Sequence, residues 1–101
     1  MRREAVIQKE LVFFLRMRGW FVKSTHGNLY QSGFPDLFCC HATYGPRWVE
    51  VKLPGMRGSH FTTAQLEIFP QMCACGAGVW VITGVAEYKK LFLDCNWYHY
   101  L

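Results

Sequence analysis

Two short segments of the chain carry residues whose types and spacing could do chemistry. The first is Gly33-Phe34-Pro35-Asp36, and the second is Glu50-Val51-Lys52, whose glutamate comes fourteen positions after the aspartate. Two carboxylates can hold a hard divalent cation such as Mg²⁺, which prefers oxygen ligands and keeps several of its waters. A lysine beside such a cation can orient a water or stabilise negative charge on a phosphate. The pattern therefore predicts a metal-dependent site that hydrolyses phosphodiesters.

Strand periodicity places the acid and the lysine of the second segment together. Residues 47–53 read as a strand, and side chains alternate across a strand, so Glu50 and Lys52 share one face while apolar residues occupy the other. A hairpin with a preceding strand over 34–42 would bring Asp36 close to Glu50. Each half alone has an ordinary explanation, as a half-buried strand with a solvated ion pair or as a Pro-Asp turn. Together the two halves are far more specific than either one.

Hydrophobic periodicity and turn residues predict the remaining elements. They are a helix over 2–18, strands over 20–23, 34–42 and 47–53, a helix over 62–75, a strand over 78–83 and a short helix over 85–93. Trp97-Tyr98-His99-Tyr100 reads as a last strand or a packing arm, and Pro70 is expected to kink or divide the second long helix. The order α-β-β-β-α-β predicts one α/β domain over 1–101, with a mixed β-sheet flanked by helices.

With Glu4 upstream and Gln65 downstream, this set of residues resembles the PD-(D/E)XK nuclease superfamily, and most of all its VRR-NUC (virus-type replication-repair nuclease) group. The resemblance runs from Glu4 to about Leu91 and implies the restriction-endonuclease-like PD-(D/E)XK core, which uses the same order of elements. It also implies that Mg²⁺, for which Mn²⁺ would substitute, is bound by three carboxylates and one backbone carbonyl, those of Asp36, Glu50, Glu4 and Val51. Lys52 and Gln65 complete the catalytic set that it implies.

Two members of that set have alternative explanations. Gln65 also completes a capping box with Thr62, three positions before it, at the start of a predicted helix. Glu4 lies on the inward stripe of the first helix, but an acid in a first turn is also favoured by the helix dipole. Glu10 lies on the same helix and competes with Glu4 for the role of metal ligand.

The charge balance permits binding to nucleic acid. The formal net charge is +4, the pI is about 8.9, and only seven residues are Asp or Glu, so few acids would repel phosphates. Trp20, Tyr30 and Trp48 could stack on bases, although core packing is the default for aromatic residues in so small a domain. A solvated surface is likewise the ordinary place for each candidate DNA contact, and these are Arg2, Arg3, Lys23, Ser24, His26, Arg47 and Arg57.

Composition also bears on oligomeric state and compartment. The first helix carries a second apolar stripe of Val6, Phe13 and Met17, and this surplus in a chain that is 51% hydrophobic predicts a homodimer. Five cysteines and no signal peptide predict reduced thiols in the cytoplasm of a bacterium or a phage-infected host cell. No apolar run approaches the length of a membrane span, and Cys73-Ala74-Cys75 lacks the second pair of a zinc site.

These features predict a Mg²⁺-dependent, structure-selective DNA endonuclease. The resemblance implies phosphodiester hydrolysis in branched DNA that leaves a 5′-phosphate, because short members of the group resemble Holliday-junction resolvases, often act as dimers and belong to DNA replication and repair. Two alternatives are a nuclease for flaps or linear duplex DNA and a non-catalytic DNA-binding module that retains the fold. The intact Asp36, Glu50 and Lys52 argue against the module, which has no need of all three.

Overall fold

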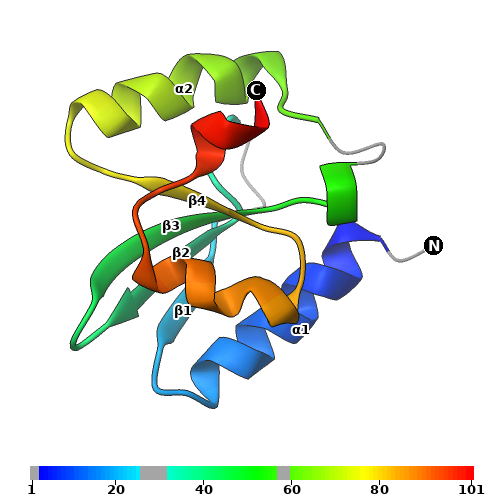
Figure 1. The fold of residues 1–101 in the computed structure, drawn as a ribbon, viewed down its shortest axis with the longest axis vertical. Coiled ribbons are helices and arrows are strands. Elements are labelled where there is room, and N and C mark those ends of the chain that lie inside the picture. The colour runs from blue at the N-terminus through cyan, green and yellow to red at the C-terminus, as the bar shows by residue number, and fades with distance from the viewer. Residues whose placement is uncertain (1–2, 26–31, 57–59) are drawn as a thin grey trace.

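The computed structural model describes residues 3–25, 32–56 and 60–101. Its elements are α1 (Glu4–Arg16), β1 (Phe21–Ser24), β2 (Leu37–His41), β3 (Gly45–Val51), η2 (Pro54–Met56), α2 (Thr63–Ala74), β4 (Val79–Ile82), η3 (Val85–Phe92) and η4 (Trp97–Tyr100), where η marks a 3₁₀ helix (Figure 1). The predicted α/β class and the order of its helices and strands are confirmed. Arg2, His26, Tyr30 and Arg57 lie outside the described residues.

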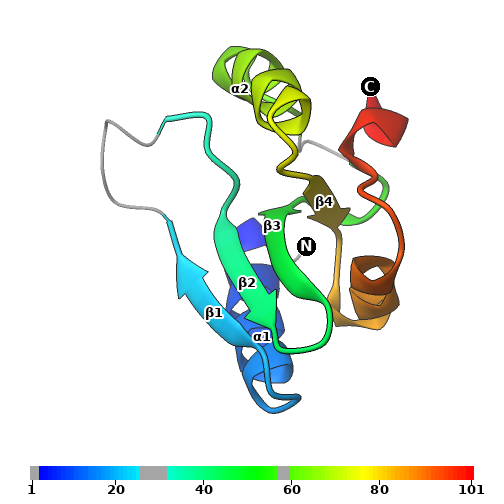
Figure 2. The same cartoon turned by 90° about the vertical axis from the view of Figure 1, so that its left-hand side faces the viewer.

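A four-stranded mixed sheet in the order β1-β2-β3-β4 forms the centre of the domain. β1, β2 and β3 make an antiparallel meander, and β4 runs parallel to β3 after the chain has crossed over through α2. α1 and η3 pack on one face of this sheet, while α2 and η4 pack on the other, over β3 and β4 (Figures 1 and 2). The flanking helices that the sequence predicted are therefore present on both faces.

α1 covers its face of the sheet with a stripe of buried residues. These lie four positions apart, on one side of the helix, and are Ile7, Leu11 and Leu15. The chain leaves the helix through Gly19, whose positive φ of 86° suits glycine, and β1 follows at once. The second apolar stripe, Val6, Phe13 and Met17, is exposed on the single chain.

α2 begins with a complete capping box and is not divided at Pro70. The Thr62 hydroxyl accepts the Gln65 amide N–H, and the Gln65 side chain accepts the Thr62 N–H. Proline removes the hydrogen bond to the carbonyl of Leu66, one turn earlier. Both Pro70 and Leu66 are exposed, so water can serve that carbonyl. The prediction of a division at Pro70 is therefore wrong, because the proline falls on the solvent side of the helix.

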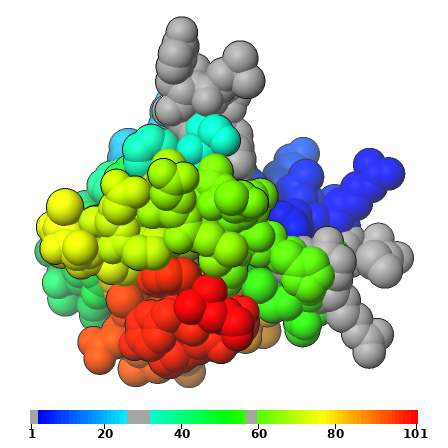
Figure 3. All heavy atoms as spheres, turned by 90° about the horizontal axis from the view of Figure 1, so that it is seen from above, coloured from blue at the N-terminus to red at the C-terminus, as the bar shows by residue number. Residues whose placement is uncertain are grey.

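The C-terminal segment is a packing arm and contains no strand. η4 lies along α2 (Figure 3), and the buried Trp97 ring meets Phe69 edge-on at a centroid distance of 5.7 Å. Asn96, the residue before η4, pairs with the outer edge of β4 through its side chain. Its Oδ1 accepts the Val81 N–H at 2.6 Å, and its Nδ2 donates to Val81 O at 3.2 Å. One asparagine thus replaces the neighbouring strand that this edge would otherwise need, and the alternative of a last strand is wrong.

Candidate active site

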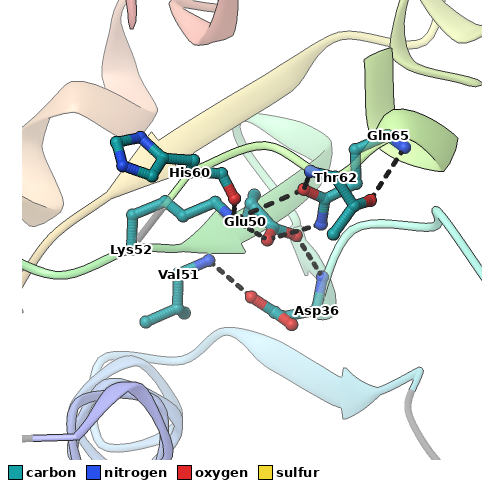
Figure 4. A network of polar contacts seen from close by, with 7 residues as sticks. All are labelled: Asp36, Glu50, Val51, Lys52, His60, Thr62 and Gln65. Atoms are coloured by element: carbon teal, nitrogen blue, oxygen red, sulfur yellow. Dashed lines mark hydrogen bonds and ion pairs between the residues drawn. The ribbon is translucent and has the colours of Figure 1, made fainter. Parts of the chain in front are cut away.

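The β2–β3 hairpin brings the two acids of the sequence pattern together. Leu37 pairs with Val49, so Asp36, just before β2, lies next to Glu50. The Asp36 amide N–H donates to Glu50 Oε1 at 3.2 Å, and Asp36 Oδ2 accepts the Val51 amide N–H at 2.7 Å (Figure 4). The predicted convergence of Asp36 and Glu50 is therefore present, and it is held by two hydrogen bonds between side chain and backbone.

Lys52 reaches the same place from the end of β3. Its amide N–H donates to Ile82 O, which continues the pairing with β4 by one residue and fixes the backbone. Its ammonium lies 3.2 Å from Glu50 Oε2 and donates to the backbone carbonyl of His60 at 2.8 Å (Figure 4). The alternation that predicted a shared face for Glu50 and Lys52 thus places them in direct contact.

Gln65 joins this pair from the first turn of α2. Its Nε2 donates to Glu50 Oε2 at 2.7 Å, and its Oε1 accepts both the Lys52 ammonium at 3.3 Å and the Thr62 N–H of the capping box. One side chain therefore caps the helix and also belongs to the buried cluster, while its catalytic role stays a prediction.

Gly33, the glycine of the first segment, has a structural role in the loop before β2, which the sequence alone did not reveal. Gly33 has a φ of 87°, and a Cβ there would lie 2.9 Å from both Ala64 O and Ile68 Cδ1 of α2. Only glycine lets the loop pass this close to the helix. On its other side, Thr25 donates its hydroxyl to Pro35 O and its amide to Asp36 O. The loop is thereby held between β1 and α2, with Asp36 directed toward β3.

The cluster is buried, and burial changes its electrostatics. The exposed fractions are 7% for Asp36, 2% for Glu50, 4% for Lys52 and 8% for Gln65. Burial first, and then the negative charge of Asp36, raises the pKa of Glu50 to about 8, while the Lys52 ammonium and the Gln65 amide oppose the rise. An added cation beside both carboxylates would stabilise ionised Glu50, which is the property expected of a metal ligand held in a low-dielectric site.

The oxygen donors of the cluster fit Mg²⁺ better than zinc. Zinc sites in proteins are built mainly from Cys and His side chains, whereas carboxylate and carbonyl oxygens suit Mg²⁺. Magnesium keeps several waters and needs only one or two carboxylates, and Asp36 and Glu50 supply two. Glu50 Oε2 already accepts two hydrogen bonds, while Oε1 accepts that of the Asp36 amide. A carboxylate oxygen has two lone pairs, so Oε1 is the Glu50 oxygen with room for a cation.

The two acids of α1 occupy different surroundings. Glu4 is the first residue of α1 and is half-buried. Glu10 lines a separate hollow of about 410 Å³, together with Pro54, Thr83 and Glu87. The assignment of a helical acid to the metal stays a prediction.

The candidate DNA contacts fall into two groups among the described residues. Arg3, Lys23 and Ser24 are exposed. Arg47 pairs with Cys39, on the face that α1 covers, and its guanidinium donates to Leu91 O at 2.8 Å and lies 4.6 Å from the centre of the Trp80 ring. The structure therefore places Arg47 on the opposite face from Glu50. The alternation that located Glu50 and Lys52 could have found this, because Arg47 is an odd number of positions from both.

Comparison with known proteins does not assign the chain to a family: no family model, curated protein or solved structure matches it. Within the described ranges, no helix has the length and apolar character that crossing a membrane requires. The interpretation of the site thus rests on its own residues and contacts.

Proposed function

We propose that this chain is a Mg²⁺-dependent DNA endonuclease of the PD-(D/E)XK type, related to the VRR-NUC group, that cuts branched DNA. One observation carries the proposal: Asp36, Glu50, Lys52 and Gln65, each singled out by its place in a sequence pattern, form one buried, mutually bonded cluster. The sheet order and the α-β-β-β-α-β succession support it as well, because the resemblance implies the same core.

The burial of the cluster is what separates it from a chance ion pair on a strand. Taking a carboxylate and an ammonium out of water costs several kcal/mol per ion, and their attraction often fails to offset it, so a buried pair is weak evidence for a stabilising role. Groups with strongly shifted pKa values also gather at functional sites, because catalysis needs acids and bases whose pKa values suit the reaction. A pair that served only a solvated strand face would be exposed, whereas Glu50 and Lys52 are almost fully buried.

Each residue has a defined task in the proposed hydrolysis. Asp36 and Glu50, with the Val51 carbonyl and Glu4, would hold Mg²⁺, which when bound polarises a phosphodiester oxygen and lowers the pKa of a coordinated water. Lys52 is fixed by three acceptors and so presents a preorganised positive charge to the phosphate as negative charge builds up on it. Gln65 orients Glu50 and Lys52 at once. A water adds to phosphorus and loses a proton, the bond from phosphorus to the 3′ oxygen breaks, and that oxygen takes up a proton, so that the products are a 5′-phosphate and a 3′-hydroxyl.

The exposed apolar stripe of α1 supports a homodimer. Val6, Phe13 and Met17 share one side of the helix and are all exposed, and a second copy of the chain would cover them. Two sites in such a dimer could cut two strands of a junction. We place this activity in the cytoplasm of a bacterium or a phage-infected cell, where thiols stay reduced.

A non-catalytic DNA-binding module is the second candidate, and one observation favours it. Among the described residues, every buried side-chain nitrogen and oxygen has a hydrogen-bond partner within the protein. The cluster is therefore satisfied by its own contacts, as a purely structural network would be. A nuclease for flaps or linear duplex DNA uses the same chemistry as the first proposal and differs only in substrate.

Cleavage of a labelled panel tests the proposal. The panel contains a four-way junction, a 5′ flap, a linear duplex and a single strand, each incubated in Mg²⁺ and in Mn²⁺ with wild type and with Asp36→Ala. Symmetric cuts in the junction that Asp36→Ala fails to make are the expected result. Cuts restricted to flaps or linear DNA would keep the chemistry and reject the junction as substrate. If pure wild type cuts nothing in either metal, the module is the better interpretation.

A further inference from the structure

The sheet face that carries Glu50 is only partly covered by helices. α2 and η4 pack there through Phe69 and Trp97, on Val79 and Val81 of β4. β1 is the strand at the opposite edge of the sheet (Figure 2). On the β1–β2 side, Phe21 is 60% exposed, although a phenylalanine on a strand is usually buried on at least one side.

Three aromatic side chains run across this face from the edge strand toward α2. They come from three neighbouring strands, and we call them the aromatic row: Phe21, Phe38 and Trp48. The ring centroids of Phe21 and Phe38 are 6.4 Å apart, and those of Phe38 and Trp48 are 4.9 Å apart. Phe38 and Trp48 are half-buried and Phe21 is exposed. The row is therefore open to solvent mainly at Phe21, its outer end, while the ring of Phe34 lies 6.2 Å from that of Trp48 at the inner end.

The aromatic row borders the candidate active site. Phe38 comes two residues after Asp36, and Trp48 comes two residues before Glu50. Residues two apart on a strand share a face and lie about 7 Å from one another. The inner end of the row, formed by Phe38 and Trp48, therefore lies about 7 Å from the carboxylates. Two stacked bases span about the same distance, at about 3.4 Å per base.

The charges around the aromatic row suit a polyanion. The exposed Lys23 pairs with Phe38 across the two strands and so lies on the same face. Between Glu10 and Glu67 the only acids are the two of the cluster, Asp36 and Glu50. A DNA strand that crosses this face would meet Lys23, and the three strands β1, β2 and β3 carry no acid other than Glu50. The positive charge of Lys23 beside the row favours a polyanion such as DNA over an uncharged partner.

We infer that the aromatic row stacks the unpaired bases of the DNA strand that flanks the cut, with Lys23 on its phosphates. The inference rests on the proposed nuclease function and deepens it by naming the substrate class: branched DNA with an unpaired strand beside the branch. Aromatic side chains stack on every base because each base has a flat face. A continuous duplex keeps those faces inside its own stack, so the row selects against it.

Binding measured without cleavage tests the inference. The affinities of wild type, Phe21→Leu and Phe21→Tyr are compared in EDTA, by fluorescence anisotropy, for a labelled single strand, a flap with an unpaired arm, and a blunt duplex. Phe21 is exposed, so these changes spare the core, and Phe92→Ala on η3 is the control for an aromatic residue elsewhere. Loss of one base–aromatic stack weakens binding about 5- to 150-fold. We expect Phe21→Leu to lose this much affinity for the single strand and the flap, while its affinity for the duplex changes by less than about twofold. Phe21→Tyr and Phe92→Ala should bind all three DNAs with wild-type affinity.

Three outcomes would overturn the inference. One is unchanged affinity of Phe21→Leu for the single strand, and another is equal loss on the single strand and the duplex. The third is a fall in molar mass of Phe21→Leu by light scattering with unchanged DNA affinity, which would make the aromatic row an interface between two copies. The nuclease proposal fails separately, by the absence of cleavage in Mg²⁺ and Mn²⁺, and selective loss of single-strand binding would stand even then.

Discussion

Replacing Glu50 by Gln should remove a pH dependence of stability that this one carboxyl group produces. Glu50 is 2% exposed, and burial together with Asp36 raises its pKa from 4.5 to about 8. Between these two values the folded protein holds a proton that the unfolded chain has released. The free energy of unfolding therefore falls as the pH rises from about 4.5 to about 8. The stabilisation that comes from the proton on Glu50 is fully present below about pH 4.5 and is lost above about pH 8.

The size of the effect follows from the single proton. One proton bound only in the folded state changes the free energy of unfolding by about 1.4 kcal/mol per pH unit. From about pH 5 to about pH 8 the wild type should thus lose up to about 4 kcal/mol relative to Glu50→Gln, a large share of the roughly 5–15 kcal/mol of a small domain. Urea unfolding followed by tryptophan fluorescence in EDTA, at several pH values, measures the difference between the two proteins.

Two further measurements make this test specific. Glu67→Gln changes an exposed glutamate of α2 and should keep the slope of the wild type. Saturating Mg²⁺ should flatten the wild-type slope, because a bound cation favours ionised Glu50. If wild type and Glu50→Gln lose stability in parallel between about pH 5 and about pH 8, the assigned proton on Glu50 is refuted.

Four other changes give measurable outcomes. Lys52→Met keeps the packing of the stem and removes the ammonium, so cleavage should fall by about 10²–10³-fold with an unchanged circular dichroism spectrum, whereas Lys89→Met on the exposed side of η3 should cut normally. Asp36→Ala should abolish Mg²⁺ binding in calorimetry, and an unchanged affinity would mean that the ligands are misassigned. Phe13→Glu should convert the dimer to a monomer in light scattering, and a monomeric wild type would contradict the proposed interface. Leu15→Ala should lower the free energy of unfolding by about 2–5 kcal/mol in urea, because Leu15 is fully buried.

Local periodicity was enough to predict most of the framework. The buried residues of α1 recur every four positions, and the side chains of β3 alternate between the two faces of the sheet. Both repeats follow from the geometry of a single helix or strand. The capping box of Thr62 and Gln65 and the β2–β3 hairpin are likewise short-range features. For these reasons the sequence by itself determined the order of the elements, the shared face of Glu50 and Lys52, and the approach of Asp36.

Contacts between distant segments were decided only by the tertiary structure. The Gln65 amide meets Glu50 across fifteen positions because α2 crosses back over the sheet, and Asn96 meets Val81 because the C-terminal arm returns to the edge of β4. The burial of Lys52 and the raised pKa of Glu50 follow from that packing as well. No pattern within a few residues encodes such contacts, because they depend on which surfaces the folded chain brings together. The sequence therefore determined which residues can take part in the site, and the packing of α2 on the sheet decided that Gln65 joins them.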